Sequence, residues 1–191
     1  MDRIQEARNV VYYAHSNQRD KVGGLYEYHP ERVKENLESL PAFKKLTKQE
    51  QEDAQVAALL HDVIEDSPKH GLRKYKAESL LKLGFTSRSI ELVVLMTRSK
   101  SIPDAEYYDA IANDKVARLI KLADIADNLN AERAAKLEPK VREELSEKYS
   151  KALVAIGVTK ADEKWLESRK LVEIPFRHWE KSRWVYEWSE S

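Results

Sequence analysis

Apolar residues recur at helical spacing along most of this chain, and prolines and glycines interrupt the pattern at intervals. Gly and Pro are scarce, at five and six residues, which argues against a turn-rich all-β fold. Thr47 and Glu50 have the spacing of a capping box ahead of an apolar run, as expected where a helix begins. We therefore predict an all-α helical bundle with helices over 3–18, 30–40, 47–67, 74–83, 87–97, 103–112, 114–132 and 139–157.

The composition changes after Gly157. All four tryptophans lie in the last 27 residues: Trp165, Trp179, Trp184 and Trp188. A short helix is expected near 161–169, followed by a strand or extended segment over 171–175. A stretch of roughly 34 residues is too short for a core of its own. We therefore predict one domain over 1–158 and, over 159–191, a Trp-rich accessory tail that packs on it.

Charge and cysteine content narrow the function classes. Lys plus Arg and Asp plus Glu balance at 33 each, so no strongly basic surface suggests a nucleic-acid partner. There is no Cys, which leaves His and carboxylates as the transition-metal ligands. No run approaches the roughly 20 apolar residues of a membrane span. The first residues lack the apolar centre of a signal peptide, so the expected location is the cytoplasm.

An unusual group of ionisable residues interrupts the apolar run AALLHDVIED, residues 57–66. Burying charges in such a helix costs several kcal/mol unless a partner or a metal compensates. At helical spacing, His61 shares a face with Glu65, and Asp62 shares the adjacent face with Asp66. The same residues also have a simpler interpretation as a solvated helix end.

Two other residues join this group as candidate metal ligands. Asp124 lies in the apolar helix VARLIKLADIADNL with Lys121 and Asn128 on its face, where it is alternatively an ordinary partner of Lys121. His29 precedes a helix expected to begin at Pro30, and it is alternatively a capping or core histidine. Together these residues offer two imidazoles and two carboxylates, a mixed set that suits Mn, Fe or Co.

The distant His, the His-Asp pair and the later Asp form the pattern of the HD superfamily of metal-dependent phosphohydrolases. Five segments further resemble the hydrolase domain of the RelA/SpoT alarmone enzymes and their small stand-alone relatives. They read AHSNQRDKVGGLYEYHP at 14–30, AALLHDVIED at 57–66, LVVLMTRSK at 92–100, KLADIADNL at 121–129 and EKYSKALVAIG at 147–157. This resemblance covers about 1–158 in order and leaves the tail unmatched.

The resemblance implies roles for individual residues. It implies that His29, His61, Asp62 and Asp124 hold a divalent ion, usually Mn²⁺ in this family. Glu65 and Asp66 match the catalytic pair that orients and deprotonates the attacking water, and Lys21 and Asn128 match substrate contacts. The implied reaction removes the 3′-pyrophosphate from a small-molecule guanosine alarmone.

Four positions depart from the family pattern. Asp20 stands where a basic residue usually precedes Lys21, with Arg19 one place earlier as a replacement phosphate contact. Ile125, Asn130 and Ala131 replace residues that are usually basic or polar. We therefore keep two alternatives, an HD hydrolase of another nucleotide and a non-catalytic nucleotide-binding regulator. The sequence leaves a homo-oligomer open.

Overall fold

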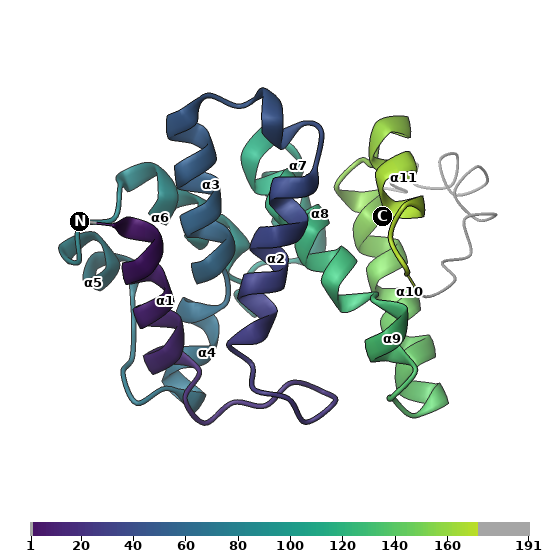
Figure 1. The fold of residues 1–191 in the computed structure, drawn as a ribbon, viewed down its shortest axis with the longest axis horizontal. Helices are drawn as coiled ribbons and strands as arrows, with labels where there is room; N and C mark the ends of the chain where they lie inside the picture. The colour runs from purple at the N-terminus through teal and green to yellow at the C-terminus, as the bar shows by residue number, and fades with distance from the viewer. Residues whose placement is uncertain (1, 172–191) are drawn as a thin grey trace.

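The computed structural model describes residues 2–171, and within them helices carry the whole architecture (Figure 1). The only β-type pairings in this range are two isolated bridges, Arg19 with Leu25 and Asn130 with Leu171. The predicted all-α class is therefore confirmed. The helices are α1 (Arg3–Ala14), α2 (Tyr28–Ser39), the 3-10 turn η1 (Phe43–Lys45), α3 (Lys48–Leu60), α4 (Val63–His70), α5 (Ala77–Lys82), α6 (Ser87–Met96), α7 (Asp104–Ala112), α8 (Lys115–Asn128), α9 (Ala131–Ala134), α10 (Pro139–Ala155) and α11 (Lys160–Glu167).

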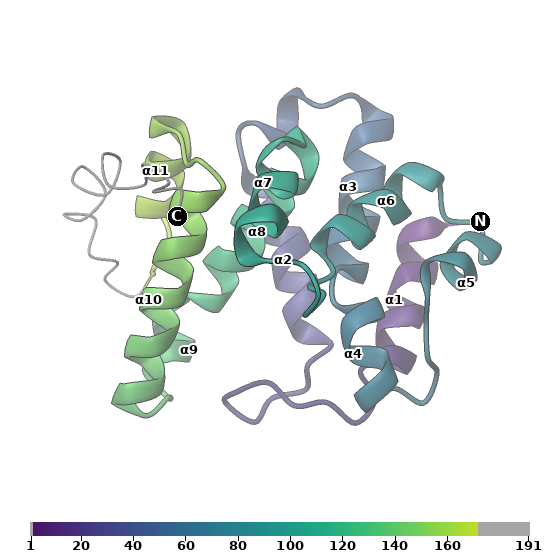
Figure 2. The same ribbon diagram turned by 180° about the vertical axis from the view of Figure 1, so that it is seen from behind.

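The core forms around α3 and α8. Helix α3 packs against α1, α2, α6 and α8, while α2 packs closely along α8. Helix α10 contacts α7 and α8 and lies at the opposite end of the bundle from α1 (Figures 1 and 2). The loop between α1 and α2 extends from below α1 towards α9 and α10 (Figure 1). This arrangement brings the middle helices, that loop and α10 around one region.

The helix predicted over 47–67 is interrupted, which corrects the sequence analysis. Helix α3 begins after the capping box of Thr47 and Glu50, as expected, but it ends at Leu60, and α4 begins at Val63. His61 and Asp62 form a turn between the two helices, where His61 Nε2 lies 3.0 Å from Asp62 Oδ2. Asp66 still follows Asp62 by one helical turn, because its backbone N–H donates to the Asp62 carbonyl oxygen at 2.9 Å. Only the predicted continuity of the helix is wrong.

Other helix ends also differ from prediction. Helix α2 begins at Tyr28, so His29 lies inside its first turn and is buried rather than preceding the helix. Helix α8 ends at Asn128, and the short α9 follows after Asn130, whose side chain accepts a hydrogen bond from the Arg133 backbone N–H. That cap ends the continuous helix predicted over 114–132.

The first part of the tail packs on the helical body. Trp165 and Leu166 of α11 are buried in the main core, and the Trp165 indole N–H donates to Ser39 Oγ at 3.1 Å. The other three tryptophans and most of the segment 171–175 lie outside the described residues. The domain boundary at 158 therefore stays a prediction. No helix within residues 2–171 is long and apolar enough to cross a membrane.

Candidate metal centre and active site

Two buried histidines and two carboxylates meet between α2, α8 and the α3–α4 turn. His29 Nε2 lies 3.4 Å from Asp124 Oδ1 and 3.8 Å from Asp62 Oδ2. His61 Nε2 lies 3.0 Å from Asp62 Oδ2 and 3.8 Å from Asp124 Oδ1. Ligand atoms of His29, His61 and Asp124 all lie within 4.8 Å of one another. The structure thus brings together four residues that are up to 95 positions apart in the sequence.

Hydrogen bonds fix the direction of both imidazole rings. His61 Nδ1 lies 2.8 Å from the Ala58 carbonyl oxygen, which only accepts, so Nδ1 carries the proton. His29 Nδ1 lies 2.7 Å from Asp127 Oδ2 and is oriented in the same way. In the neutral rings, both Nε2 lone pairs then face the carboxylates. His61 Nε2 is buried and has no hydrogen-bond partner within the described residues. This donor set fits a divalent metal ion.

The electrostatics of the cluster also favour a cation. Burial opposes protonation of His29, but the carboxylates of Asp124, Asp127 and Asp62 outweigh it and raise its pKa to about 9. Burial likewise opposes protonation of His61, and the neighbouring carboxylates of Asp62 and Asp124 still raise its pKa. The carboxylates therefore require positive charge beside them, either as protons on the rings or as a bound cation.

A second layer of residues holds Asp124 and His29 in place. Lys121 Nζ lies 3.0 Å from Asp124 Oδ2, so the ion pair expected from the sequence is present alongside the metal-like geometry. Asn128 Nδ2 donates to Asp124 Oδ1 at 2.6 Å. Asp127, which the sequence analysis missed, is buried and accepts from Arg32 Nε at 2.6 Å as well as from His29. No local pattern singled out Asp127, because its partners His29 and Arg32 lie 98 and 95 positions earlier in the sequence.

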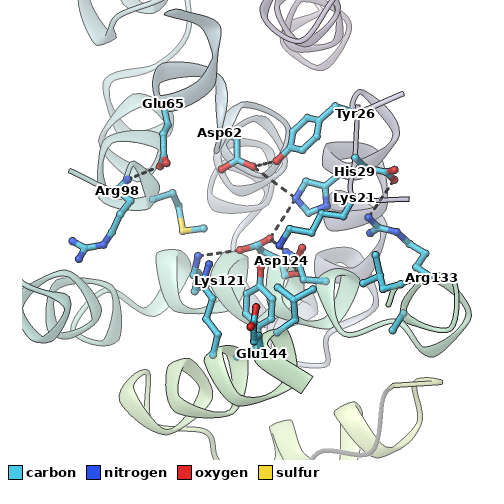
Figure 3. Close-up of a pocket in the computed structure, with 18 of the residues that line it drawn as sticks. Lys21, Tyr26, His29, Asp62, Glu65, Arg98, Lys121, Asp124, Arg133 and Glu144 are labelled. Atoms are coloured by element: carbon cyan, nitrogen blue, oxygen red, sulfur yellow. Dashed lines mark hydrogen bonds and ion pairs between the residues drawn. The ribbon is translucent and has the colours of Figure 1, made fainter. Parts of the chain in front are cut away.

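Three of the four clustered residues, His29, Asp62 and Asp124, line a cavity of about 750 Å³, whereas His61 is not among its lining residues (Figure 3). The α1–α2 loop, α7, α8, α9 and α10 supply most of the wall. Three tyrosines that the sequence analysis did not select line this cavity: Tyr107, Tyr108 and Tyr149. They come from α7 and α10, so only the tertiary packing brings them to the site. The cavity is large enough for a small organic ligand.

The two predicted catalytic carboxylates have different surroundings. Glu65 lines the cavity, and its Oε2 accepts from the Arg98 backbone N–H at 3.0 Å. Asp66 is not among the lining residues, and its Oδ2 accepts from Gln18 Nε2 at 2.7 Å. The Gln18 side-chain oxygen Oε1 in turn lies 2.7 Å from His15 Nδ1. Glu65 is therefore the better-placed of the two to contact a ligand.

The predicted substrate contacts Arg19, Lys21 and Asn128 all line the cavity, but they differ in whether their side chains already bind other protein groups. Arg19 and Lys21 belong to the α1–α2 loop, whereas Asn128 uses its amide N–H on Asp124. Tyr26 donates its hydroxyl proton to Asp62 and packs between the rings of His15 and His29. The nearby Tyr28 is exposed and does not line the cavity. Tyr26 is thus committed to the Asp62 carboxylate.

Comparison with known proteins agrees with this geometry. The HD domain family matches residues 26–129, a range that contains all four clustered residues. The chain belongs to the HD domain family. This membership and the fold support a metal-dependent phosphohydrolase, and HD domains bind divalent metals at a His-His-Asp group of the kind found here.

One solved structure shares the fold over nearly the whole chain. It is a metazoan ortholog of SpoT described as hydrolysing ppGpp, and it matches with a TM-score of 0.66 at 24% sequence identity. The match covers 88% of this chain and 93% of that one. At this identity the likeness establishes the shared fold alone. A search of curated proteins gave no match.

Proposed function

We propose that this HD domain chain removes pyrophosphate from the 3′ position of an alarmone nucleotide such as (p)ppGpp. The observation that carries the proposal is the convergence of two imidazole Nε2 atoms and two carboxylates beside a cavity with several cationic side chains. The sequence resemblance to the RelA/SpoT hydrolase domain supports this substrate class. The likeness to the metazoan SpoT ortholog is consistent with it.

In this proposal His29, His61, Asp62 and Asp124 hold one divalent ion, with Mn²⁺ as the expected metal. When bound, such an ion supplies a Lewis acid for phosphate oxygens and lowers the pKa of water at neutral pH. Asp127 keeps the His29 ring in the ligating tautomer, and Asn128 and Lys121 fix the Asp124 carboxylate. The chain's own hydrogen bonds thus prepare the ligand set before any ion enters.

Glu65 acts as the general base in this scheme. Its carboxylate faces the cavity and is anchored by the Arg98 backbone N–H, which leaves oxygen lone pairs to orient an attacking water and take its proton. Asp66, whose carboxylate accepts from Gln18, ties α4 to the α1–α2 loop next to Glu65. Arg19 and Lys21 neutralise charge on the substrate phosphates, and Asn128 contributes its remaining carbonyl oxygen.

A different nucleotide substrate is the second candidate, favoured by the Asp20 carboxylate in the cavity wall. The other departures from the family pattern weigh less. Ile125 is fully buried in the core, and neither Asn130 nor Ala131 lines the cavity. These three positions therefore do not alter the cavity wall, and Asp20 alone among the four departures does. A non-catalytic regulator remains a third reading, and an absence of turnover on every nucleotide would favour it.

The test is a nucleotide panel assayed with Mn²⁺, with products separated by chromatography. The panel contains guanosine and adenosine 3′-pyrophosphates, nucleoside monophosphates and cyclic nucleotides. Release of pyrophosphate from a guanosine 3′-pyrophosphate supports the proposal. Turnover of another nucleotide alone would keep the phosphohydrolase and overturn the alarmone assignment. Asp109→Asn, on the exposed face of α7, serves as a control for nonspecific effects of substitution.

A further inference from the structure

Three cationic side chains from three separate elements line one part of the cavity. Lys21 comes from the α1–α2 loop, Arg133 from α9 and Lys148 from α10. Neither lysine forms an ion pair within the described part of the chain, and Lys148 lies over the Tyr149 ring at 5.2 Å. Burial and the positive charges of Lys148 and Arg133 lower the pKa of Lys21, so these cations are close enough to repel one another. Such a grouping is stabilised by an anion.

Arg133 is held rigidly at this place. Its guanidinium donates to Asp20 Oδ2 at 3.2 Å and to the Asp127 carboxylate. Asp20 is itself fixed, because its Oδ1 accepts from the backbone N–H groups of Val22 at 3.0 Å and Gly24 at 2.8 Å. The Arg133–Asp20 pair therefore ties α9 to the turn that carries Lys21. A preorganised guanidinium loses little conformational entropy when it binds an oxyanion.

Acidic side chains also line the cavity near these cations. Asp20 pairs with Arg133, and Glu147 on α10 pairs with Lys151. Glu144 lies one helical turn before Lys148 on α10. Figure 3 draws Arg133 on one side of Asp124 and Glu65 on the other, so Arg133 lies apart from the predicted general base. The sequence analysis assigned the phosphate contact beside Lys21 to Arg19. The structure offers Arg133, whose contact with Asp20 explains why an acidic residue is tolerated there.

We propose that Lys21, Arg133 and Lys148 form an anion subsite that binds a second phosphate or diphosphate group of the substrate. The group that is cleaved lies at the His29–Asp124 cluster, and the subsite selects substrates that carry phosphate at another position. The inference rests on the proposed phosphohydrolase function. It assigns Arg133 and Lys148 as specificity-determining residues and gives Asp20 the role of a competing anion.

The experiment measures binding of inorganic pyrophosphate to the full chain by calorimetry, with metals removed by a chelator. Lys148→Gln and Arg133→Gln should each weaken binding by about tenfold, the usual loss for one charge-assisted hydrogen bond. Lys140→Gln, on α10 and outside the cavity wall, is the matched control and should change nothing. Arg133→Lys keeps the charge and should recover part of the affinity.

Asp20→Asn gives the sharpest test because its expected effect has the opposite sign. The amide oxygen can still accept from Val22 and Gly24, so the turn is preserved, while the charge that competes for Arg133 is lost. Pyrophosphate should then bind several-fold more tightly. Weaker or unchanged binding in Asp20→Asn, or full affinity in Arg133→Gln and Lys148→Gln, would overturn the subsite. Normal pyrophosphate binding in a chain that hydrolyses no nucleotide would uphold the subsite and reject the proposed function.

Discussion

Replacing Asp127 with Asn removes the charge that orients His29 but leaves all four proposed metal ligands in place. The carboxylate accepts from His29 Nδ1 at 2.7 Å and from Arg32 Nε at 2.6 Å, and its side chain is 3% exposed. Loss of such an outer carboxylate typically weakens metal binding by about 10–100-fold. We expect Asp127→Asn to weaken Mn²⁺ binding within this range.

The same substitution should also lower the free energy of unfolding. Breaking a fully buried ion pair costs about 3–5 kcal/mol. Arg32 and Arg133, the two guanidinium partners, are 34% and 22% exposed, and the amide can still accept one hydrogen bond. Water therefore offsets part of the loss, and we expect a decrease of about 2 kcal/mol.

Two assays check these values. Calorimetric titration of metal-stripped protein with Mn²⁺ gives the affinity, and urea denaturation gives the free energy of unfolding. Asp109→Asn, an exposed neutralisation on α7, should match the wild type in both. An Asp127→Asn protein that binds Mn²⁺ within threefold of the wild type would refute the assigned role of Asp127.

Three other substitutions test separate parts of the account. Glu65→Gln should retain the fold and Mn²⁺ binding but lose about 10²–10⁴-fold in turnover, measured by product chromatography. Near-normal turnover would show that another residue is the general base. Burial tends to raise the pKa of Asp162, but hydrogen bonds from Thr159 and the ion pair with Arg118 outweigh it and lower this pKa below its ordinary value. The stabilisation that the Asp162 carboxylate gives the folded state is therefore present above the unfolded pKa and is lost as the pH falls through the lower folded pKa. Asp162→Asn should therefore lower the free energy of unfolding by about 1 kcal/mol at pH 7. In acid titrations of stability, the difference in unfolding free energy between variant and wild type should disappear. A difference that persists below the folded pKa would contradict this. Trp165→Ala should lower the free energy of unfolding by about 3–5 kcal/mol in urea denaturation, whereas a loss below about 1 kcal/mol would show that α11 is not part of the core.

Local sequence signals predicted the helices well where caps and breakers mark them. The Thr47 capping box begins α3, and Pro139 begins α10, as expected. Periodicity could not predict the turn at His61 and Asp62, because the apolar run continues on both sides of it. That turn is stabilised by tertiary contacts, including the hydrogen bond from Tyr26 to Asp62.

The candidate site was predicted in part for the same reason. Residue types and order pointed to His29, His61, Asp62 and Asp124, and these four side chains lie together. The supporting residue Asp127 and the cation Arg133 were not selected, because each acts through partners far away in the sequence. Local patterns carry no information about such pairings.

The most direct test of the central claim titrates metal-stripped protein with Mn²⁺ and follows pyrophosphate release from a guanosine 3′-pyrophosphate. The account predicts that turnover rises with added Mn²⁺ and saturates at one ion per chain, and that Asp124→Asn abolishes it. Turnover that persists in excess chelator, or that Asp124→Asn leaves unchanged, would contradict a metal-dependent reaction at this cluster.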